Sequence, residues 1–289
     1  MSPAAARSPL LRGIDFSSRP TRRKPIVVAE GRFVDAGDSG VAGTTCPPAP
    51  QVQLLSLRRC ADEAAFAALL REPGPWLGAF DLPFGLPREL VEALGWPTEW
   101  LALMRHYLAH DRAQIRATFA AFCAARPAGG KFAHRTCDGP AGSSPSMKWV
   151  NPPVAYMLHA GVAALLEAGC DLPGLHAGDP QRQALEAYPG LLARELIGRR
   201  PYKSDDRAKQ TPEREAARVD LVDALAAGRS RLGWQLVIDV DQRKALIADA
   251  SGDALDAVLC LLQAAWGSTQ PNFGWPADVD RLEGWILSA

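Results

Sequence analysis

Short apolar runs bounded by turn residues alternate with segments of helical periodicity along this chain. Three runs near the N-terminus predict strands, within Leu10–Ser18, Pro25–Val34 and Val52–Leu57. The Gly/Ser/Thr/Pro-rich segment Asp35–Pro50 predicts a surface loop between the second and the third. Three consecutive strands with such connections indicate an antiparallel meander.

The pattern then changes from strands to a helix and back. Asp62–Arg71 is predicted to be a helix, because its apolar residues Phe66, Leu69 and Leu70 share one face. An apolar strand follows from Trp76 and ends in an acid, Asp81, before a Pro/Gly turn. A strand, a helix and a strand after a meander imply a parallel crossover into the same sheet. The expected fold class is therefore α/β, with a mixed sheet and flanking helices.

A long helical insertion is predicted at about residues 88–170. Thr98, Asp111 and Pro153 each mark the start of a helix within it. The polar and basic segment from Lys131 to Lys148 is too long and too rich in glycine for an ordinary helix connection.

The remaining third of the chain alternates again between strand and helix signals. Leu236–Asp239 fits either a strand or the end of a helix. The other predictions are a strand at Gln183–Tyr188, a helix at Pro189–Ile197, a basic loop at Gly198–Pro212, helices at Glu213–Ala227 and Gly252–Trp266, a turn at Pro271–Pro276 and a late edge strand at Arg281–Leu287.

Composition adds limits to this picture. The 289 residues are 47% hydrophobic, which suits a single domain at residues 10–289 after a disordered tail at residues 1–9. Lys and Arg balance Asp and Glu at 32 each, so nucleic-acid binding would need local basic patches. Six cysteines without a C-x-x-C spacing indicate reduced thiols in a cytoplasmic protein. Neither a secretory signal nor an apolar run of membrane-spanning length is present, so no membrane partner is expected.

Acidic residues stand where strands predict burial. Asp15 lies in the first apolar strand, and a carboxylate there is costly unless it is paired or bound to a cation. Asp81 ends the strand from Trp76. Asp253 and Asp256 are three residues apart in the last strong helix, so they share a face beside its apolar stripe. If the two strands pair and the helix packs on them, all four acids converge.

Such a cluster suits Mg²⁺ or Mn²⁺, which prefer carboxylate and water oxygens. Two ions about 3.5–4 Å apart would clamp the attacking and leaving oxygens of a phosphodiester. Asp15 would bridge both ions, Asp81 and Asp256 would each hold one, and Asp253 would support the second. Glu186, at the end of the Gln183 strand, is a further candidate metal ligand.

The element order and four short phrases resemble known proteins. Three strands, a helix, a strand, a helical insertion, a strand and an acidic C-terminal helix resemble the RNase H-like fold. The order of the acids is similar to that of Holliday-junction resolvases of the RuvC kind, although those usually have Glu where this chain has Asp81. From about Leu10 to Ile286 the chain resembles an uncharacterised family of predicted nucleases of RNase H fold, in the phrases Gly13-Ile14-Asp15, Asp81-Leu82-Pro83-Phe84-Gly85, Glu186-Ala187-Tyr188-Pro189 and Gly252-Asp253-Ala254-Leu255-Asp256-Ala257.

Each candidate residue also has a purely structural interpretation. Asp253 follows Gly252 at a helix start and could be an N-cap, and Asp81 could form a turn. Asp256 could be a solvated surface acid, and Glu186 could simply pair with an arginine. The basic loop Gly198–Pro212 includes acids that could neutralise it.

The expected function is metal-dependent hydrolysis of nucleic-acid phosphodiester bonds. Arg135, Lys148 and Lys203 are the expected phosphate ligands, because they lie in the two basic loops. A phosphotransferase or nucleotide-binding protein of the same fold is an alternative, but its phosphate hairpin would need glycine, which Ser17–Lys24 lacks. A binding module that kept the acids without activity is another. The sequence has no P-loop, G-x-G-x-x-G or G-x-S-x-G motif.

Overall fold

The computed structural model describes residues 8–34 and 49–289. The predicted loop Asp35–Pro50 therefore lies almost wholly outside the described residues, and so does most of the predicted tail at residues 1–9. No helix of the described chain combines the length and hydrophobicity needed to cross a membrane.

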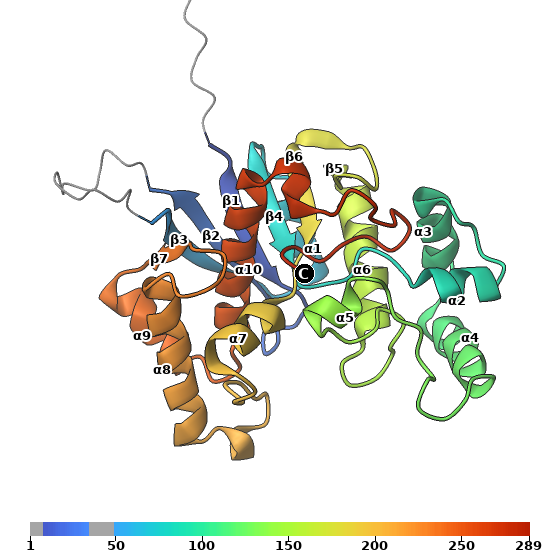
Figure 1. The fold of residues 1–289 in the computed structure, drawn as a ribbon. Coiled ribbons are helices and arrows are strands. Elements are labelled where there is room, and N and C mark those ends of the chain that lie inside the picture. The colour runs from blue at the N-terminus through green and yellow to red at the C-terminus, as the bar shows by residue number, and fades with distance from the viewer. Residues whose placement is uncertain (1–7, 35–48) are drawn as a thin grey trace, which may run out of the picture.

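A seven-stranded mixed sheet forms the centre of the molecule, in the order β5-β6-β4-β1-β2-β3-β7 (Figure 1). The antiparallel meander is confirmed, since β2 pairs antiparallel with both β1 and β3. The predicted parallel crossover is confirmed as well, because β4 pairs parallel with β1. The strands are β1 (Leu10–Asp15), β2 (Ile26–Phe33), β3 (Gln51–Cys60), β4 (Trp76–Phe80), β5 (Cys170–Asp171), β6 (Asp179–Glu186) and β7 (Gln235–Val237).

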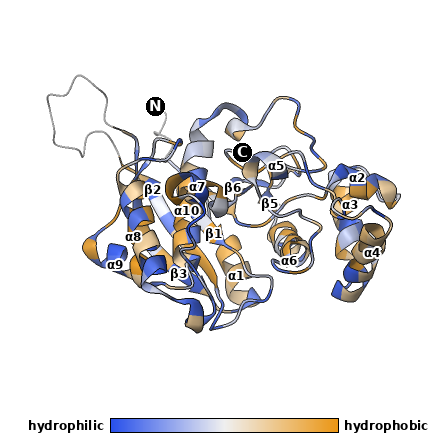
Figure 2. Ribbon diagram, turned by 60° about the horizontal axis from the view of Figure 1, so that its bottom comes forward, coloured by the Kyte–Doolittle hydropathy of each residue, from blue (hydrophilic) through white to orange (hydrophobic). Residues whose placement is uncertain are grey.

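Helix α10 (Asp253–Thr269) covers one face of the sheet and is itself almost entirely buried. Alternate residues of β1 and β4, including Leu11, Leu77 and Ala79, share a hydrophobic core with it. Three further helices complete this layer, and Figure 2 shows the hydrophobic residues concentrated between the layers. They are α7 (Pro189–Ile197), α8 (Pro212–Ala226) and α9 (Val240–Ala248).

The opposite face packs against α1 (Glu63–Leu70) and the helical segment that follows β4. Ile14 and Phe80 point into this second core, where they meet Phe66 of α1 and Leu158 of the long helix α6. The predicted helical insertion therefore shares its core with the sheet. Its helices are α2 (Arg88–Ala93), α3 (Trp100–Leu108), α4 (Arg112–Ala124), α5 (Asp138–Ala141) and α6 (Val154–Glu167).

The structure differs locally from the sequence prediction at five places. The predicted late strand at residues 281–287 is wrong, because that segment forms turns whose apolar residues are buried without strand pairing. The ambiguous segment at residues 236–239 contributes to β7, which extends the sheet beside β3. Helix α9 and the two-residue strand β5 were not predicted. The turn expected at Pro271–Pro276 is a short 3₁₀ helix, Pro271–Gly274.

Candidate metal centre

Gly13 allows the last helix to lie directly on the first strand. A Cβ at position 13 would lie 2.0 Å from the carbonyl oxygen of Ala257 and 2.1 Å from the backbone nitrogen of Leu261. Only glycine permits this approach of two backbones. Asp15 is two residues further along the strand and therefore faces the same helix, where it meets the first turn of α10 and its Asp256.

Asp81 joins these two acids from the neighbouring strand. β1 and β4 are parallel, so their carboxyl ends lie side by side, and the backbone nitrogen of Asp81 donates to the carbonyl oxygen of Ile14 at 2.8 Å. Oxygens of Asp15, Asp81 and Asp256 all lie within 4.8 Å of one another. The predicted convergence of acids is thus observed for three of the four.

Burial and the charges of neighbouring acids disfavour the charged forms of Asp15 and Asp81. Asp15 is 8% exposed and Asp256 is fully buried. Burial first, and then the charges of Asp256 and other nearby acids, raise the pKa of Asp15 well above its ordinary value. The same two causes raise the pKa of Asp81 from 3.8 to about 7. A divalent cation would relieve this repulsion, so the electrostatics fit a cation site.

Two lysines already supply positive charge at the cluster. The Lys203 ammonium forms an ion pair with Asp256, whose other oxygen accepts a hydrogen bond of 2.5 Å from the Tyr202 hydroxyl. Lys203 was predicted as a phosphate ligand, and it does lie at the site, although its partner here is a carboxylate. Burial and Asp256 raise the pKa of the Tyr202 hydroxyl well above 10.

Asp253 lies beside the cluster and is held by a different lysine. Its carboxylate accepts from Lys24 at 2.8 Å, and Lys24 also contacts Asp205 at 2.9 Å. Asp253 is not the N-cap, because Gly252 occupies that position with a φ of 76°. Its charge still raises the pKa of Asp15, which places it close enough to act on the site without sharing the three-acid cluster.

Glu186 faces away from this cluster. On β6 it is in register with Phe80, whose side chain points into the core opposite α10. Its two oxygens accept hydrogen bonds of 2.7 and 2.8 Å from the guanidinium of Arg135, which also pairs with Asp138. All three side chains are at most 3% exposed. This geometry argues against the predicted roles of Glu186 as a metal ligand and of Arg135 as a phosphate ligand.

The ion pair of Arg135 and Glu186 nevertheless helps to fix the backbone next to Asp81. The backbone nitrogen of Phe84 donates to Glu186 at 2.9 Å, which holds the turn that follows Asp81. The third predicted phosphate ligand, Lys148, is half-buried and is not among the residues lining the cavities around the acids.

Sequence reasoning missed Lys24 and Tyr202 as parts of the site. Both contacts join segments far apart in the chain, so no local pattern indicates them. The only signal was that Lys24 belongs to the basic turn after the strand of Asp15, and that Tyr202 belongs to the basic loop Gly198–Pro212.

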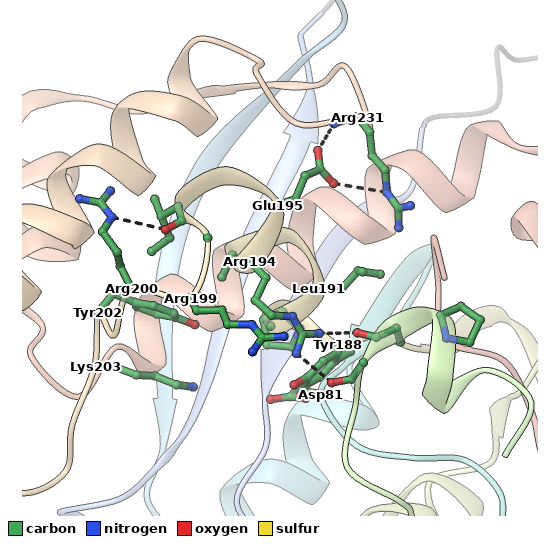
Figure 3. A pocket seen from close by; sticks show the side chains of 18 of the residues that line it. Asp81, Tyr188, Leu191, Arg194, Glu195, Arg199, Arg200, Tyr202, Lys203 and Arg231 are labelled. Carbon is green, nitrogen blue, oxygen red and sulfur yellow. Dashed lines mark hydrogen bonds and ion pairs between the residues drawn. The ribbon is translucent and has the colours of Figure 1, made fainter. Parts of the chain in front are cut away.

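Three cavities meet at Asp81 and Lys203. The largest, about 900 Å³, lies along α7 and contains Arg194, Arg199 and Arg200 (Figure 3). A second, about 330 Å³, extends under Asp81 toward α6. The third, about 460 Å³, contains Asp15, Lys24 and Asp253. Asp81 therefore lies where the three cavities meet, and Arg194, Arg199 and Arg200 form a basic arm on one side of it.

Comparison of the chain with protein-family models, with curated proteins and with solved structures gave no match.

Proposed function

We propose that this protein is a metal-dependent nuclease that hydrolyses phosphodiester bonds of nucleic acids. The observation that carries the proposal is the convergence of Asp15, Asp81 and Asp256 within 4.8 Å, with Asp81 lining all three cavities and Asp15 one of them. Their donor set consists of oxygens only, which suits Mg²⁺ or Mn²⁺ and is poor for softer metals.

The sheet supports assignment to the RNase H-like fold. β3, β2, β1, β4 and β6 are adjacent in that order, with β2 as the antiparallel strand and α1 in the crossover. The acids stand at the ends of the first and fourth strands and on the last long helix, as in the proteins that the sequence resembles. Because one fold hosts many activities, the proposal rests on the site rather than on this topology.

Asp15, Asp81 and Asp256 would hold the metal. The chemistry supplied at this site would be polarisation of the phosphoryl group and activation of a water molecule for attack. Tyr202 orients Asp256 through its hydroxyl hydrogen bond. Lys203 lines all three cavities, so its ammonium would be available to contact a phosphate oxygen bound beside Asp81.

The chain's own charges also limit what binds without metal. Lys203 and Lys24 neutralise part of the acidic cluster in the metal-free protein. A phosphodiester carries negative charge, so it approaches the basic arm more readily than the acids themselves. Metal and substrate are therefore expected to bind cooperatively.

The direct test is cleavage in Mn²⁺ of a panel of single-stranded, duplex, hybrid and branched substrates. Asp15→Asn keeps the size of the side chain but removes the central charged ligand, and should reduce cleavage to background. Asp241→Asn is the matched control, because Asp241 is 93% exposed on α9. If the protein binds nucleic acid but shows no cleavage that depends on Asp15, the result would favour a non-catalytic binding module.

A further inference from the structure

The cavity beneath Asp81 differs in character from its two neighbours. Its walls are mainly apolar and come from four separate segments: Leu82, Pro83, Val154, Met157, Tyr188 and Ile286. The polar groups that reach it are the hydroxyls of Ser143 and Ser144, the buried pair Arg135 and Glu186, and, on the side of the acid cluster, Asp81 and Lys203. A mainly apolar pocket with a few polar groups is typical of a small-ligand site.

We propose that this pocket receives one unpaired nucleobase next to the phosphate that is cleaved. The inference deepens the proposed function and rests on it: the substrate is then an unpaired strand, or a duplex with an unpaired nucleotide at the cleavage position. Asp81 belongs both to the pocket and to the acid cluster, so a base in the pocket brings its own phosphate to the acids.

The size of the pocket favours a single base. About 330 Å³ is close to the lower end of the usual range of ligand sites, about 300–1,000 Å³. That volume suits one nucleoside and excludes a stacked base pair. Enzymes that act on a single base accommodate it in such a pocket by hydrogen bonds to its edge and stacking on apolar or aromatic side chains.

Tyr188 connects this pocket to the basic cavity along α7. Its ring lines both spaces, and the guanidinium of Arg194 lies over it at 5.4 Å (Figure 3). Arg194 is fixed by its hydrogen bonds to the carbonyl oxygens of Ala141 and Gly142. The Arg194 guanidinium therefore covers one face of the Tyr188 ring. Proteins that bind single strands stack bases on aromatic side chains and gain further affinity from such arginine–ring contacts.

The basic cavity offers a path for the neighbouring phosphates. Arg199 is exposed and forms no ion pair with any acid of the described residues, while Arg200 pairs only with the exposed Asp220. Surface pairs of this kind contribute little and exchange readily. A strand can thus lie with its backbone along Arg199 and Arg200 and one base turned into the pocket under Asp81.

Binding in chelator tests the pocket without requiring activity. A fluorescent single-stranded oligonucleotide should bind wild-type protein about tenfold or more tightly than its blunt duplex, since stacking one base contributes about that factor. Met157→Trp fills the pocket from α6, where it borders the cavity of Asp15, and should remove most of this preference while leaving duplex binding unchanged. Val154→Trp is the second pocket variant. Leu166→Trp, half-buried on the same helix but outside the three cavities, is the control.

Cleavage in Mn²⁺ separates the two proposals. A duplex with one bulged nucleotide should be cut at the bulge, and the perfect duplex should resist. Equal, Asp15-dependent cleavage of both would overturn the base pocket and leave the nuclease standing. Preferential single-strand binding that both pocket variants weaken, without any cleavage, would support the pocket and overturn the nuclease. Single-strand binding that neither pocket variant changes would overturn the pocket.

Discussion

Asp81 is a carboxyl group whose protonation changes near neutral pH. Its folded-state pKa of about 7 lies above the ordinary 3.8, because burial and Asp256 disfavour its charge. The stability from this group is complete below about pH 4 and is lost as the pH rises through 7. In chelator, Asp81→Asn should keep that stability. Its advantage in unfolding free energy over wild type should grow from pH 4 to 7, to at most about 4 kcal/mol.

Urea unfolding at pH 4, 5, 6 and 7 measures this difference directly. Asp241→Asn, at an exposed site, should follow the wild-type curve at every pH. In saturating Mn²⁺ the order should reverse, because the metal stabilises the charged carboxylate and Asn is the weaker ligand. Equal losses for Asp81→Asn in both buffers would mean that this acid makes ordinary structural contacts.

The sequence allowed most, but not all, of the acid set to be predicted. Asp15 and Asp81 follow from their positions at the ends of two apolar strands that share a sheet edge. Glu186 does not join the acid cluster, and the alternation of side chains along β6 explains why. Leu185 and Ala187 face α10, so the residue between them faces the other side of the sheet. The pairing of Asp253 with Lys24 is a long-range contact, which no local pattern encodes.

Among the secondary-structure elements, the contact between β1 and α10 is the tightest that the site depends on. Gly13→Ala would place a methyl group about 2 Å from two backbone atoms of α10, so the helix has to move. We expect a loss of about 3 kcal/mol or more in chemical unfolding, beyond the usual cost of overpacking. Mn²⁺ binding should weaken as well, since Asp256 moves with the helix.

A second glycine provides the control for this variant. A Cβ on Gly130 meets nothing within 4 Å, and its backbone is not in the left-handed region. Gly130→Ala should therefore change the unfolding free energy by less than about 0.5 kcal/mol. A Gly13→Ala protein as stable as Gly130→Ala would contradict the direct backbone contact.

The link between the helical segment and the sheet depends on Arg135. Arg135→Met leaves Glu186 and Asp138 buried without their counter-charge, which typically costs about 3–5 kcal/mol. Arg243→Met removes an exposed pair with Asp223 and should cost less than about 1 kcal/mol. Thermal and urea unfolding compare the two. Similar losses would mean that the buried network does not hold the two parts together.

Elements were predictable where periodicity was strong and local. Helix α1 starts one residue after its predicted boundary, where Asp62 caps it through the nitrogen of Ala65 at 2.8 Å. Helix α9 was missed because it has a single buried residue, Leu246, and therefore no apolar stripe. The segment after residue 281 is apolar because its side chains pack around Glu186 and α10. A buried apolar run of this kind has the same sequence pattern as a buried strand, so it was predicted to be one.

For the whole molecule, metal binding should appear as thermal stabilisation. A ligand that binds only the folded state adds about 2.7 kcal/mol at a hundredfold excess over its Kd, which raises Tm by several degrees in a chain of this size. Asp15→Asn should remove most of that rise, and Ca²⁺ at equal concentration should report whether the site distinguishes ions by size. An unchanged wild-type Tm in millimolar Mn²⁺ would contradict a metal centre.

The three carboxylates come from distant parts of the chain, and this has a consequence during translation. Asp81 is synthesised 175 residues before Asp256, and Asp15 earlier still. Synthesis adds about 5–20 residues per second, so a growing chain spends many seconds with only two of the three carboxylates. The proposed nuclease would thus lack one of its metal ligands beside its own messenger RNA until α10 had docked on β1.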